Sequence, residues 1–365
     1  MTEIPESEAR YLSAALQAAR VARQFLEWME RAAEQLAPQR STALAAEAER
    51  TFAEPVRALR AALDVSPPPV ELAPFASRFA EAVADIEKAF ELFTTFPSVF
   101  PPESIGRILG ALHHCAQAQE TFYLLRHALS PFAGYWQLPD VSPVDDAPEH
   151  AGNERTGITH VTKGGYHGGF SLYVPEHYSA EHEWPLIVAL HGGSGNGRDF
   201  LWTWVREAKS LGYLLVAPTA VHDTWSEDDD PGLLQILAWL SGRYRLAAGG
   251  ILLTGLSDGA TFTLLYGLAR PQVYRALAPL CGVLHPANEV IGNLQRARGV
   301  PIYLVHGALD FLFPIQLARM ARDTLSDAGA ALEYRELPEL SHTYPRSENV
   351  RILRWFEALR AADAK

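Results

Sequence analysis

The stretch Gly255-Leu256-Ser257-Asp258-Gly259 is the part of the sequence that decides the fold. It follows a short apolar run, Ile251–Thr254, and precedes a leucine-rich segment, Asp258–Ala269, with helical spacing. A serine between two glycines at a strand-to-helix turn is typical of a nucleophile elbow, where a side chain at either glycine would crowd the neighbouring backbone. The short pattern is weak alone because such turns are common, but its context predicts Ser257 as a nucleophile.

Strands and helices alternate on both sides of this turn. Several of the expected strands are apolar throughout, as buried parallel strands are. The expected strands are Phe170–Val174, Leu186–Leu190, Tyr213–Ala217, Ile251–Thr254, Ala276–Leu280, Ile302–Val305 and Leu332–Glu336, and the expected helices are Asp199–Leu211, Leu233–Tyr244, Asp258–Ala269, Pro314–Ala328 and Glu348–Ala361. The alternation predicts an α/β domain over residues 157–365, with a mostly parallel sheet flanked by helices.

Two further residues follow late strands of this predicted sheet. Asp310 comes after Ile302–Val305, where a carboxylate at the carboxyl end of a strand reaches the site. His342 lies in the loop after Leu332–Glu336. The order serine, aspartate, histidine is that of α/β-hydrolases, so we expect Ser257 as nucleophile, His342 as base and Asp310 as the orienting acid.

Other acids and histidines near these positions are alternatives for the same roles. The acids are Glu336, Glu339, Asp258 and Asp223, and the histidines are His306 and His222. Asp310 is preferred because it alone follows the penultimate strand, where this fold places the acid. His306 ends a strand directly, so we expect it to support the turn that leads to Asp310.

A second glycine-rich turn, Leu190-His191-Gly192-Gly193-Ser194-Gly195, follows an earlier strand. Such a turn can direct a backbone N–H at a developing oxyanion. We expect Gly193 to be the first donor and the amide of Asp258 the second, with His191 bracing the turn. The competing interpretation is a tight turn that takes no part in catalysis.

Apolar residues beside these motifs are candidates for the wall of an acyl or aromatic pocket. They are Trp202, Trp225, Leu256, Phe311 and Phe313. Packing in the core is the competing interpretation for each of them taken alone.

The first part of the chain has a different pattern. Four segments carry apolar residues at spacings of three and four, which predicts a helical bundle over residues 1–130. Pro55 is expected to kink or divide the second helix. Residues 131–156 are rich in proline and acidic residues and predict a linker, although its aromatic start suggests that it lies against one of the domains. We expect the bundle to act as a cap or as a surface for homo-oligomerisation.

Composition limits the partners and the compartment. Of the residues, 48% are hydrophobic and 20% charged, which suits a globular protein, and the net charge of -12 disfavours nucleic acid and anionic lipid. The two cysteines, Cys115 and Cys281, fall in different predicted domains and are expected to be buried free thiols. No signal peptide and no apolar stretch of about 20 residues is evident, so we expect no membrane span and a cytoplasmic location.

Taken with His191-Gly192-Gly193, the region from Ser257 to His342 resembles the phospholipase/carboxylesterase group and its dienelactone-hydrolase and feruloyl-esterase neighbours. The resemblance covers roughly residues 158–362. It implies a serine esterase that acts on small to medium carboxylic esters, with no metal and no organic cofactor. Thioesterase-like members commonly carry glutamine after the serine. Here Asp258 adds a negative charge beside the oxyanion hole unless its side chain points away or is paired.

Several other functions fit parts of the pattern. A feruloyl-esterase-like or polyester-depolymerase-like hydrolase would take an ester derived from a polymer. A peptidase of the prolyl-oligopeptidase type shares the catalytic fold but adds a β-propeller, whereas the added region here is helical. A noncatalytic scaffold with a vestigial hydrolase half is the alternative of another class, and the complete set of three residues argues against it.

The expected role of the bundle is tested by a shortened protein that begins near Asn153. A cap selects substrates by size and excludes water, so its removal should change ester-length preference more than the chemical step. Kinetics on a series of p-nitrophenyl esters and the association state by light scattering measure the two roles. If both match those of the full chain, the bundle is neither cap nor interface.

Overall fold

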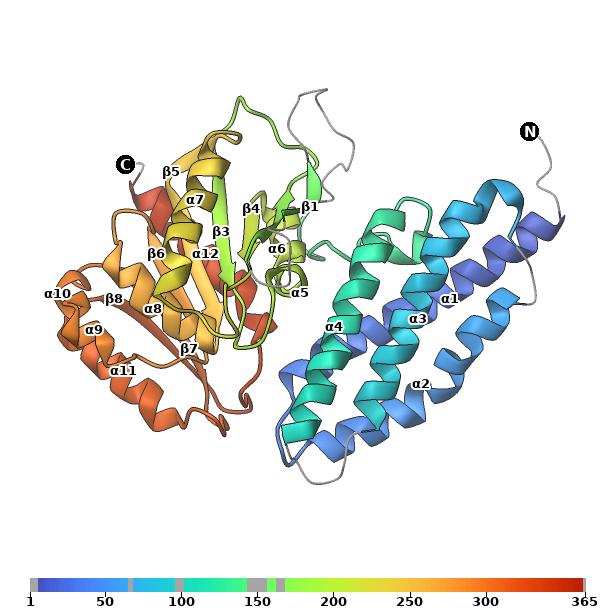
Figure 1. Ribbon diagram of the computed structural model, residues 1–365, viewed down its shortest axis with the longest axis horizontal. Helices are drawn as coiled ribbons and strands as arrows, with labels where there is room; N and C mark the ends of the chain where they lie inside the picture. The colour runs from blue at the N-terminus through green and yellow to red at the C-terminus, as the bar shows by residue number, and fades with distance from the viewer. Residues whose placement is uncertain (1–5, 65–67, 96–101, 143–155, 162–167, 364–365) are drawn as a thin grey trace. The chain divides into compact units, whose positions relative to one another are not determined.

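The computed structural model describes residues 6–64, 68–95, 102–142, 156–161 and 168–363. The chain divides into two compact units, Met1–Trp136 and Gln137–Lys365 (Figure 1). The first unit is helical, and the second alternates strands and helices. Of the predicted linker, residues 143–155 lie outside the described residues.

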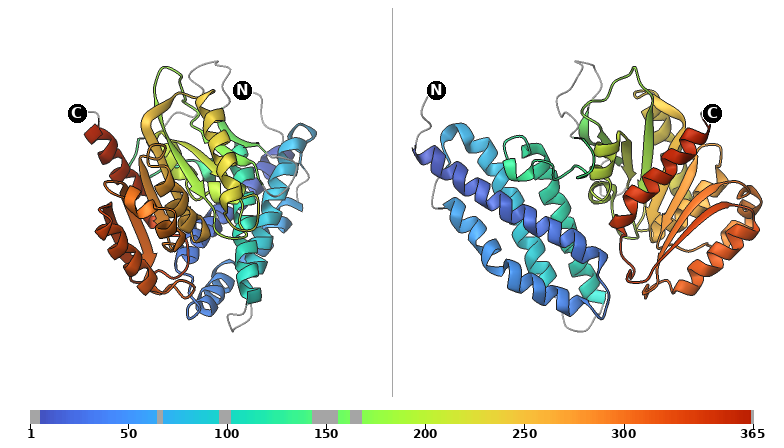
Figure 2. Two further views of the ribbon diagram at one scale, coloured as in Figure 1. Left: turned by 60° about the vertical axis from the view of Figure 1, so that its left-hand side comes forward. Right: turned by 180° about the vertical axis from the view of Figure 1, so that it is seen from behind.

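The helical unit contains four long helices, which Figure 2 shows from two further sides. They are α1 (Glu6–Glu34), α2 (Ser41–Asp64), α3 (Ala73–Thr94) and α4 (Pro102–Leu125), with short 3-10 turns η1 (Val70–Leu72) and η2 (Ser130–Phe132). Each helix turns an apolar face inward, and aromatic rings fill the centre. For example, the Phe25 ring meets Phe52 and Phe90 edge to face, with centroids 5.4 and 6.1 Å away. The predicted helical bundle is therefore present.

Pro55 does not divide the second helix, contrary to one of the two expected effects. α2 runs from Ser41 to Asp64 with Pro55 inside it. Proline leaves the carbonyl four residues earlier, on Thr51, without its helical partner, and Thr51 is exposed to water, which can satisfy it. Phe52 and Val56 are buried on the opposite side and hold both halves of the helix to the core.

Part of the buried face of α4 consists of small residues. Leu109 is 50% exposed, whereas Ala111, Cys115 and Ala118 are buried. The reason is close approach to α3, because a Cβ at Gly110 would lie only 3.1 Å from Leu92 Cδ1. Small residues allow this approach, so they occupy the interface in place of the leucines.

The aromatic residues after α4 belong to the helical unit. Phe132 is buried, and its ring stacks on Phe122 with centroids 4.4 Å apart. Tyr135 donates a hydrogen bond to Glu30 at 2.9 Å, and Arg23 donates to the carbonyl of Pro131 at 2.6 Å. The start of the predicted linker therefore completes the bundle core.

The second unit is built on one eight-stranded sheet with the order β1-β2-β4-β3-β5-β6-β7-β8. β2 is antiparallel to both neighbours, and the pairs from β4 onward are parallel. The strands are β1 (Gly157–Val161), β2 (Phe170–Val174), β3 (Trp184–Leu190), β4 (Leu214–Pro218), β5 (Leu246–Leu256), β6 (Ala276–Leu280), β7 (Pro301–Gly307) and β8 (Ala331–Leu337). The predicted mostly parallel sheet is confirmed.

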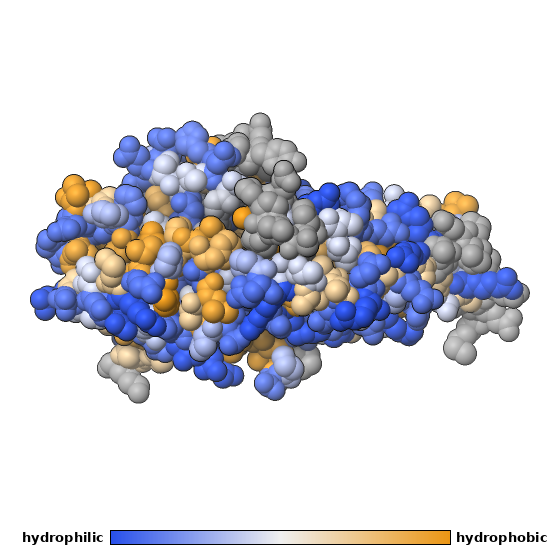
Figure 3. Space-filling view, turned by 90° about the horizontal axis from the view of Figure 1, so that it is seen from below, coloured by the Kyte–Doolittle hydropathy of each residue, from blue (hydrophilic) through white to orange (hydrophobic). Residues whose placement is uncertain are grey.

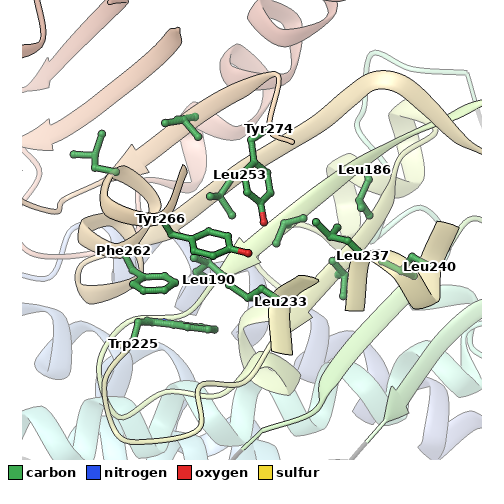
Figure 4. Close-up of a cluster of buried hydrophobic side chains, with 14 of the residues drawn as sticks. Leu186, Leu190, Trp225, Leu233, Leu237, Leu240, Leu253, Phe262, Tyr266 and Tyr274 are labelled. Carbon is green, nitrogen blue, oxygen red and sulfur yellow. The ribbon is translucent and has the colours of Figure 1, made fainter. Parts of the chain in front are cut away.

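Helices cover both faces of this sheet. Figures 1 and 2 show α7 and α8 on one face and α12 on the other. The helices are α5 (Gly197–Leu201), α6 (Val205–Leu211), α7 (Asp230–Ser241), α8 (Asp258–Ala269), α9 (Ala287–Val290), α10 (Asn293–Arg296), α11 (Ile315–Asp327) and α12 (Asn349–Asp363), with 3-10 turns η3 (Glu227–Asp229) and η4 (Arg346–Glu348). Figure 4 shows the core under α7 and α8, where Leu237, Phe262 and Tyr266 pack towards Leu186 and Leu253 of the sheet.

Three elements of this unit differ from the sequence expectation. β1 was not expected, because it is an edge strand with every residue half-buried and so lacks an apolar pattern. The expected helix Asp199–Leu211 is two helices, α5 and α6, separated at Trp202 to Trp204. The short helices α9 and α10 were also not expected, since neither is longer than four residues.

The expectation for the cysteines is confirmed, since Cys115 and Cys281 are both free and buried. Burial raises the pKa of the Cys281 thiol to about 12 and also raises that of Cys115. Among the described helices, none is long and apolar enough to cross a membrane.

Phe132→Ala tests whether residues after α4 complete the bundle core. We expect a loss of about 3–5 kcal/mol in the local stability of α4, because the change leaves a cavity against Phe122. Hydrogen exchange of α4 peptides measures it. Leu124→Ala is the matched control, since Leu124 is 56% exposed and its truncation should leave exchange unchanged. Equal exchange in both variants would contradict this packing.

Candidate active site

The turn at Ser257 has the strained geometry that its sequence predicts. Ser257 has φ 55° and ψ -114°, in the left-handed region, between the end of β5 and the start of α8. A Cβ at Gly255 would lie 2.5 Å from the carbonyl carbon of Gly259, and one at Gly259 would lie 2.4 Å from the carbonyl oxygen of His191. Both glycines are therefore required by close backbone contacts, and the turn presents the serine at the carboxyl end of the sheet.

The structure brings Ser257, His342 and Asp310 together. His342 Nε2 lies 2.8 Å from Ser257 Oγ, and His342 Nδ1 lies 2.8 Å from Asp310 Oδ2. The Asp310 side chain is fully buried and that of His342 is 10% exposed. With Nδ1–H donating to the carboxylate, Nε2 is left to accept the serine proton.

The carboxylate of Asp310 is held by its own loop. Its second oxygen, Oδ1, accepts hydrogen bonds from the backbone N–H groups of Leu312 at 3.0 Å and Phe313 at 2.7 Å. His306 supports the same loop, since its Nε2 donates to the carbonyl of Phe313 at 2.8 Å and lies 3.4 Å from Asp310 Oδ2. Burial lowers the pKa of His306, which keeps this imidazole neutral beside the acid.

The alternative bases and acids have other partners. His222 is exposed and pairs with Asp228 at 3.0 Å, and His306 donates to a backbone carbonyl as described. Glu336 pairs with Arg319, which lowers the pKa of that carboxyl. Asp223 contributes its backbone carbonyl, which accepts from Ser194.

The second glycine-rich turn lies directly against Ser257. A Cβ at Gly192 would lie 3.6 Å from Ser257 Cβ, and one at Gly193 would lie 3.8 Å from Asp258 Cβ. Within the described part of the chain, neither the N–H of Gly193 nor that of Asp258 donates a hydrogen bond to another group. Two available donors beside the serine are what an oxyanion requires.

His191 uses both ring nitrogens to brace this turn. Nε2 accepts a hydrogen bond from the N–H of Ala220 at 3.0 Å, so the proton resides on Nδ1, which lies 2.6 Å from the carbonyl oxygen of Gly192. The ring is buried. This geometry agrees with a bracing role and leaves no nitrogen for proton transfer.

Backbone strain is concentrated at this site. Among the described residues, the non-glycine positions with positive φ are Ser194, Ser257 and Cys281, at 57°, 55° and 54°. Ser194 is in the glycine-rich turn, and Cys281 follows β6 and contacts the carbonyl of Thr343, next to His342, at 3.5 Å. Such conformations persist only where surrounding contacts hold them, and they cluster at functional sites.

Of the five residues expected to line a pocket, two lie beside His342. The Phe313 and Phe311 rings are 5.2 and 6.5 Å from the His342 ring, and Phe311 is 41% exposed. Leu256 is half-buried and would contact a side chain placed at Gly192. Figure 3, which looks at the molecule from below the view of Figure 1, shows apolar side chains gathered on the surface of this unit.

Trp202 and Trp225 do not fit the expectation of a pocket wall. They are 2% and 7% exposed, so both have little surface to offer a substrate. Trp225 belongs to the hydrophobic core and donates from Nε1 to the carbonyl of His191 at 2.8 Å. The competing interpretation, core packing, describes these two residues.

Sequence reasoning missed the polar network that holds the loop of His342. Tyr344 donates to Asn349 Oδ1 at 2.7 Å, and Asn349 Nδ2 donates to the carbonyl of Thr203 at 2.8 Å and to Glu207 at 3.3 Å. Burial raises the pKa values of Tyr344 and Glu207. The position of Tyr344, close after His342, is the single sequence signal for this network; Asn349 and Glu207 carry none.

Comparison with known families now gives this geometry a context. Residues 236–358, a stretch shorter than half of the chain, match the model of the family described as Phospholipase/Carboxylesterase. Together with the strand order and the position of Ser257, this match identifies the second unit as an α/β-hydrolase fold. None of the curated proteins compared with the chain matches it.

Solved structures to which this chain is similar include esterases and a thioesterase. A thermostable esterase is 20% identical, with 52% of this chain and 59% of that one covered and a TM-score of 0.45. An acetyl xylan esterase from Aspergillus awamori is 15% identical, with 55% and 99% covered and a TM-score of 0.46. Acyl-protein thioesterase 2 from Zea mays is 18% identical, with 53% and 99% covered and a TM-score of 0.42.

Gly259→Ala tests the close contact that shapes the turn at Ser257. The added methyl group meets the carbonyl oxygens of His191 and Leu190 at 2.4 and 2.5 Å, so we expect a loss of stability of about 1–3 kcal/mol. Urea unfolding measures it.

Gly232→Ala is the matched control, because a Cβ there meets nothing within 4 Å and the residue lies inside α7. Alanine is the better helix former, so this variant should be as stable as the parent or slightly more so. A Gly259→Ala protein with undiminished stability would show that the contact is not tight.

Proposed function

We propose that the α/β unit is a serine esterase that hydrolyses carboxylic esters through an acyl-enzyme on Ser257. The observation that supports this most is the chain of hydrogen bonds from Ser257 Oγ through His342 to the buried Asp310, with distances of 2.8 Å at both steps. A serine hydroxyl is a weak nucleophile alone, and an adjacent neutral imidazole oriented by a carboxylate is the arrangement that activates it.

The proposed reaction has two halves. In the first, His342 Nε2 takes the proton of Ser257 as Oγ attacks the ester carbonyl, and it then gives that proton to the leaving alcohol. Asp310 stabilises the imidazolium that forms between these steps. In the second half, water attacks the acyl-enzyme, His342 takes a proton from it, and the acid product leaves with Ser257 restored.

The negative charge on the carbonyl oxygen of the substrate develops next to Ser257. We assign its stabilisation to the N–H groups of Gly193 and Asp258, because both lie beside the serine and donate no hydrogen bond within the described residues. The N–H of Asp258 is also in the first turn of α8, where the helix dipole favours negative charge.

The surroundings of His342 favour an ester with an apolar group. Phe311 and Leu312 are 41% and 51% exposed, and the Phe311 ring lies edge to face with the His342 ring, with centroids 6.5 Å apart. Large apolar side chains left exposed at a site offer contact area to an alkyl or aromatic group of a substrate. The same chemistry serves a thioester, whose leaving group is a better one, so thioesters belong in the substrate panel.

Ser257→Ala should remove hydrolysis while the protein stays folded, because it deletes the nucleophile and leaves little space behind. We expect kcat to fall by roughly 10³-fold or more, and His342→Ala to behave alike. Hydrolysis of p-nitrophenyl acetate, butyrate, octanoate and palmitate, of methyl ferulate and of an acyl-coenzyme A measures this and ranks the substrates.

Covalent labelling by a fluorophosphonate gives a readout that does not depend on finding the best substrate. The parent protein should be labelled and Ser257→Ala should not, whereas Ser326→Ala, an exposed serine of α11, should be labelled like the parent. Turnover by folded Ser257→Ala at the rate of the parent, or labelling of this variant, would refute the proposal.

A further inference from the structure

We infer that the side chain of Asp258 is a positioning group for the oxyanion donors: it fixes residues 220–226, here called the bracing loop, against residues 191–195, here called the oxyanion turn. The inference rests on the proposed function for its catalytic consequence. It separates two parts of one residue, since the N–H of Asp258 is the proposed donor and its carboxylate is the positioning group.

The carboxylate of Asp258 does not face the nucleophile as a bare charge. Its Oδ2 accepts a hydrogen bond from the backbone N–H of Trp225 at 2.7 Å, and the side chain is half-buried. Asp258 directly follows Ser257, so this bond ties the bracing loop to the first residue of α8. Of the two possibilities that the sequence left for this side chain, pairing is therefore the one observed, and its partner is the backbone of Trp225.

The bracing loop holds the oxyanion turn at three points. Ser194 N–H donates to the carbonyl of Asp223 at 2.6 Å, and Ala220 N–H donates to His191 Nε2 at 3.0 Å. Trp225 Nε1–H donates to the carbonyl of His191 at 2.8 Å. Gly193 lies between the residues held in this way, so the direction of its N–H follows the position of the bracing loop.

The oxyanion turn needs such support because of its own composition. It contains Gly192, Gly193 and Gly195, which have wide conformational freedom, and Ser194 at φ 57° is in a region that costs a non-glycine residue energy. Two contacts within the turn fix the carbonyl oxygen of Gly192, from Gly195 N–H at 3.1 Å and from His191 Nδ1 at 2.6 Å. The bonds that hold the Ser194 N–H and the His191 ring and carbonyl come from outside, and they depend on a bracing loop that stays in place.

Two carboxylates accept hydrogen bonds from the backbone of the bracing loop. Asp229 accepts from the N–H groups of Val221 at 2.7 Å and Ser226 at 2.8 Å, and Asp258 accepts from Trp225. The Trp225 ring is anchored separately, stacked on Phe262 at 5.7 Å, and Figure 4 shows the two rings side by side. Loss of the Asp258 carboxylate therefore frees the backbone at Trp225 without unseating its side chain.

The useful property of Asp258 is its acceptor oxygen rather than its charge. A negative charge close to the oxyanion hole opposes the charge that develops there. Burial, and to a lesser degree Asp229, raise the pKa of the Asp258 carboxyl, while the bond from Trp225 lowers it. Asparagine has the same shape and keeps an acceptor oxygen but no charge, so it separates the two properties.

Asp258→Ala and Asp258→Asn in the full chain test the inference. With p-nitrophenyl butyrate, we expect kcat of Asp258→Ala to fall roughly 10- to 100-fold with KM changed less than about threefold, since misplaced donors weaken the transition state more than the bound ester. Asp258→Asn should have a kcat at least about tenfold higher than that of Asp258→Ala, because the bond from Trp225 remains. 1,1,1-Trifluorodecan-2-one forms an adduct that carries an oxyanion. Its affinity should fall by the same factor as kcat in Asp258→Ala and should not fall in Asp258→Asn.

Hydrogen exchange gives a readout that is independent of catalysis. The amide of Ser194 should exchange faster in Asp258→Ala and at the parental rate in Asp258→Asn, because only the alanine variant releases the bracing loop. The two variants could show these exchange rates while a fluorophosphonate fails to label Ser257 in the parent protein. In that case the proposed function fails, and the link between Asp258 and the turn stands. Unchanged Ser194 exchange in Asp258→Ala, a parental kcat in that variant, or equal defects in alanine and asparagine variants would overturn the inference.

Discussion

The left-handed backbone of Ser257 is the constraint on which the rest of the α/β unit depends. Ser257 has φ 55° between a parallel strand and a helix, and this geometry brings Gly255 and Gly259 against neighbouring backbone. A Cβ added at Gly255 or Gly259 would lie 2.5 or 2.4 Å from the nearest backbone atom. One of these contacts is with the carbonyl oxygens of Leu190 and His191, at the end of β3. The turn that exposes Ser257 therefore also sets how closely residues 191–195 approach it.

The groups around Ser257 are positioned by hydrogen bonds to backbone more than by contacts between side chains. Asp310 is oriented by two N–H groups of its own loop, and His191 by one N–H and one carbonyl. Asp258 and Asp229 together hold three N–H groups of the bracing loop. Buried carboxylates with several N–H donors give loops a fixed shape, and a fixed shape is what preorganised oxyanion donors require.

Of two carboxylates close to Ser257, Asp310 is hydrogen-bonded to His342 and Asp258 is not. Asp310 lies against His342 Nδ1 and is buried, whereas Asp258 is turned to Trp225 and burial raises its pKa. His306, with its pKa lowered by burial, adds a neutral donor behind Asp310 instead of a competing positive charge.

The sequence by itself determined those features of this protein that depend on local patterns of residues. Apolar periodicity predicted the helices of the bundle and the parallel sheet, and the strict spacing around Ser257 predicted the turn, because both patterns are local. That Asp310 and His342 would meet Ser257 was predicted from their order after late strands. Tertiary structure decided what depends on contacts between distant segments. The sequence left open whether Trp202 and Trp225 pack in the core and whether Asp258 is paired. It did not show the edge strand β1 or the small residues that bury α4. Each of these features is set by a partner far along the chain.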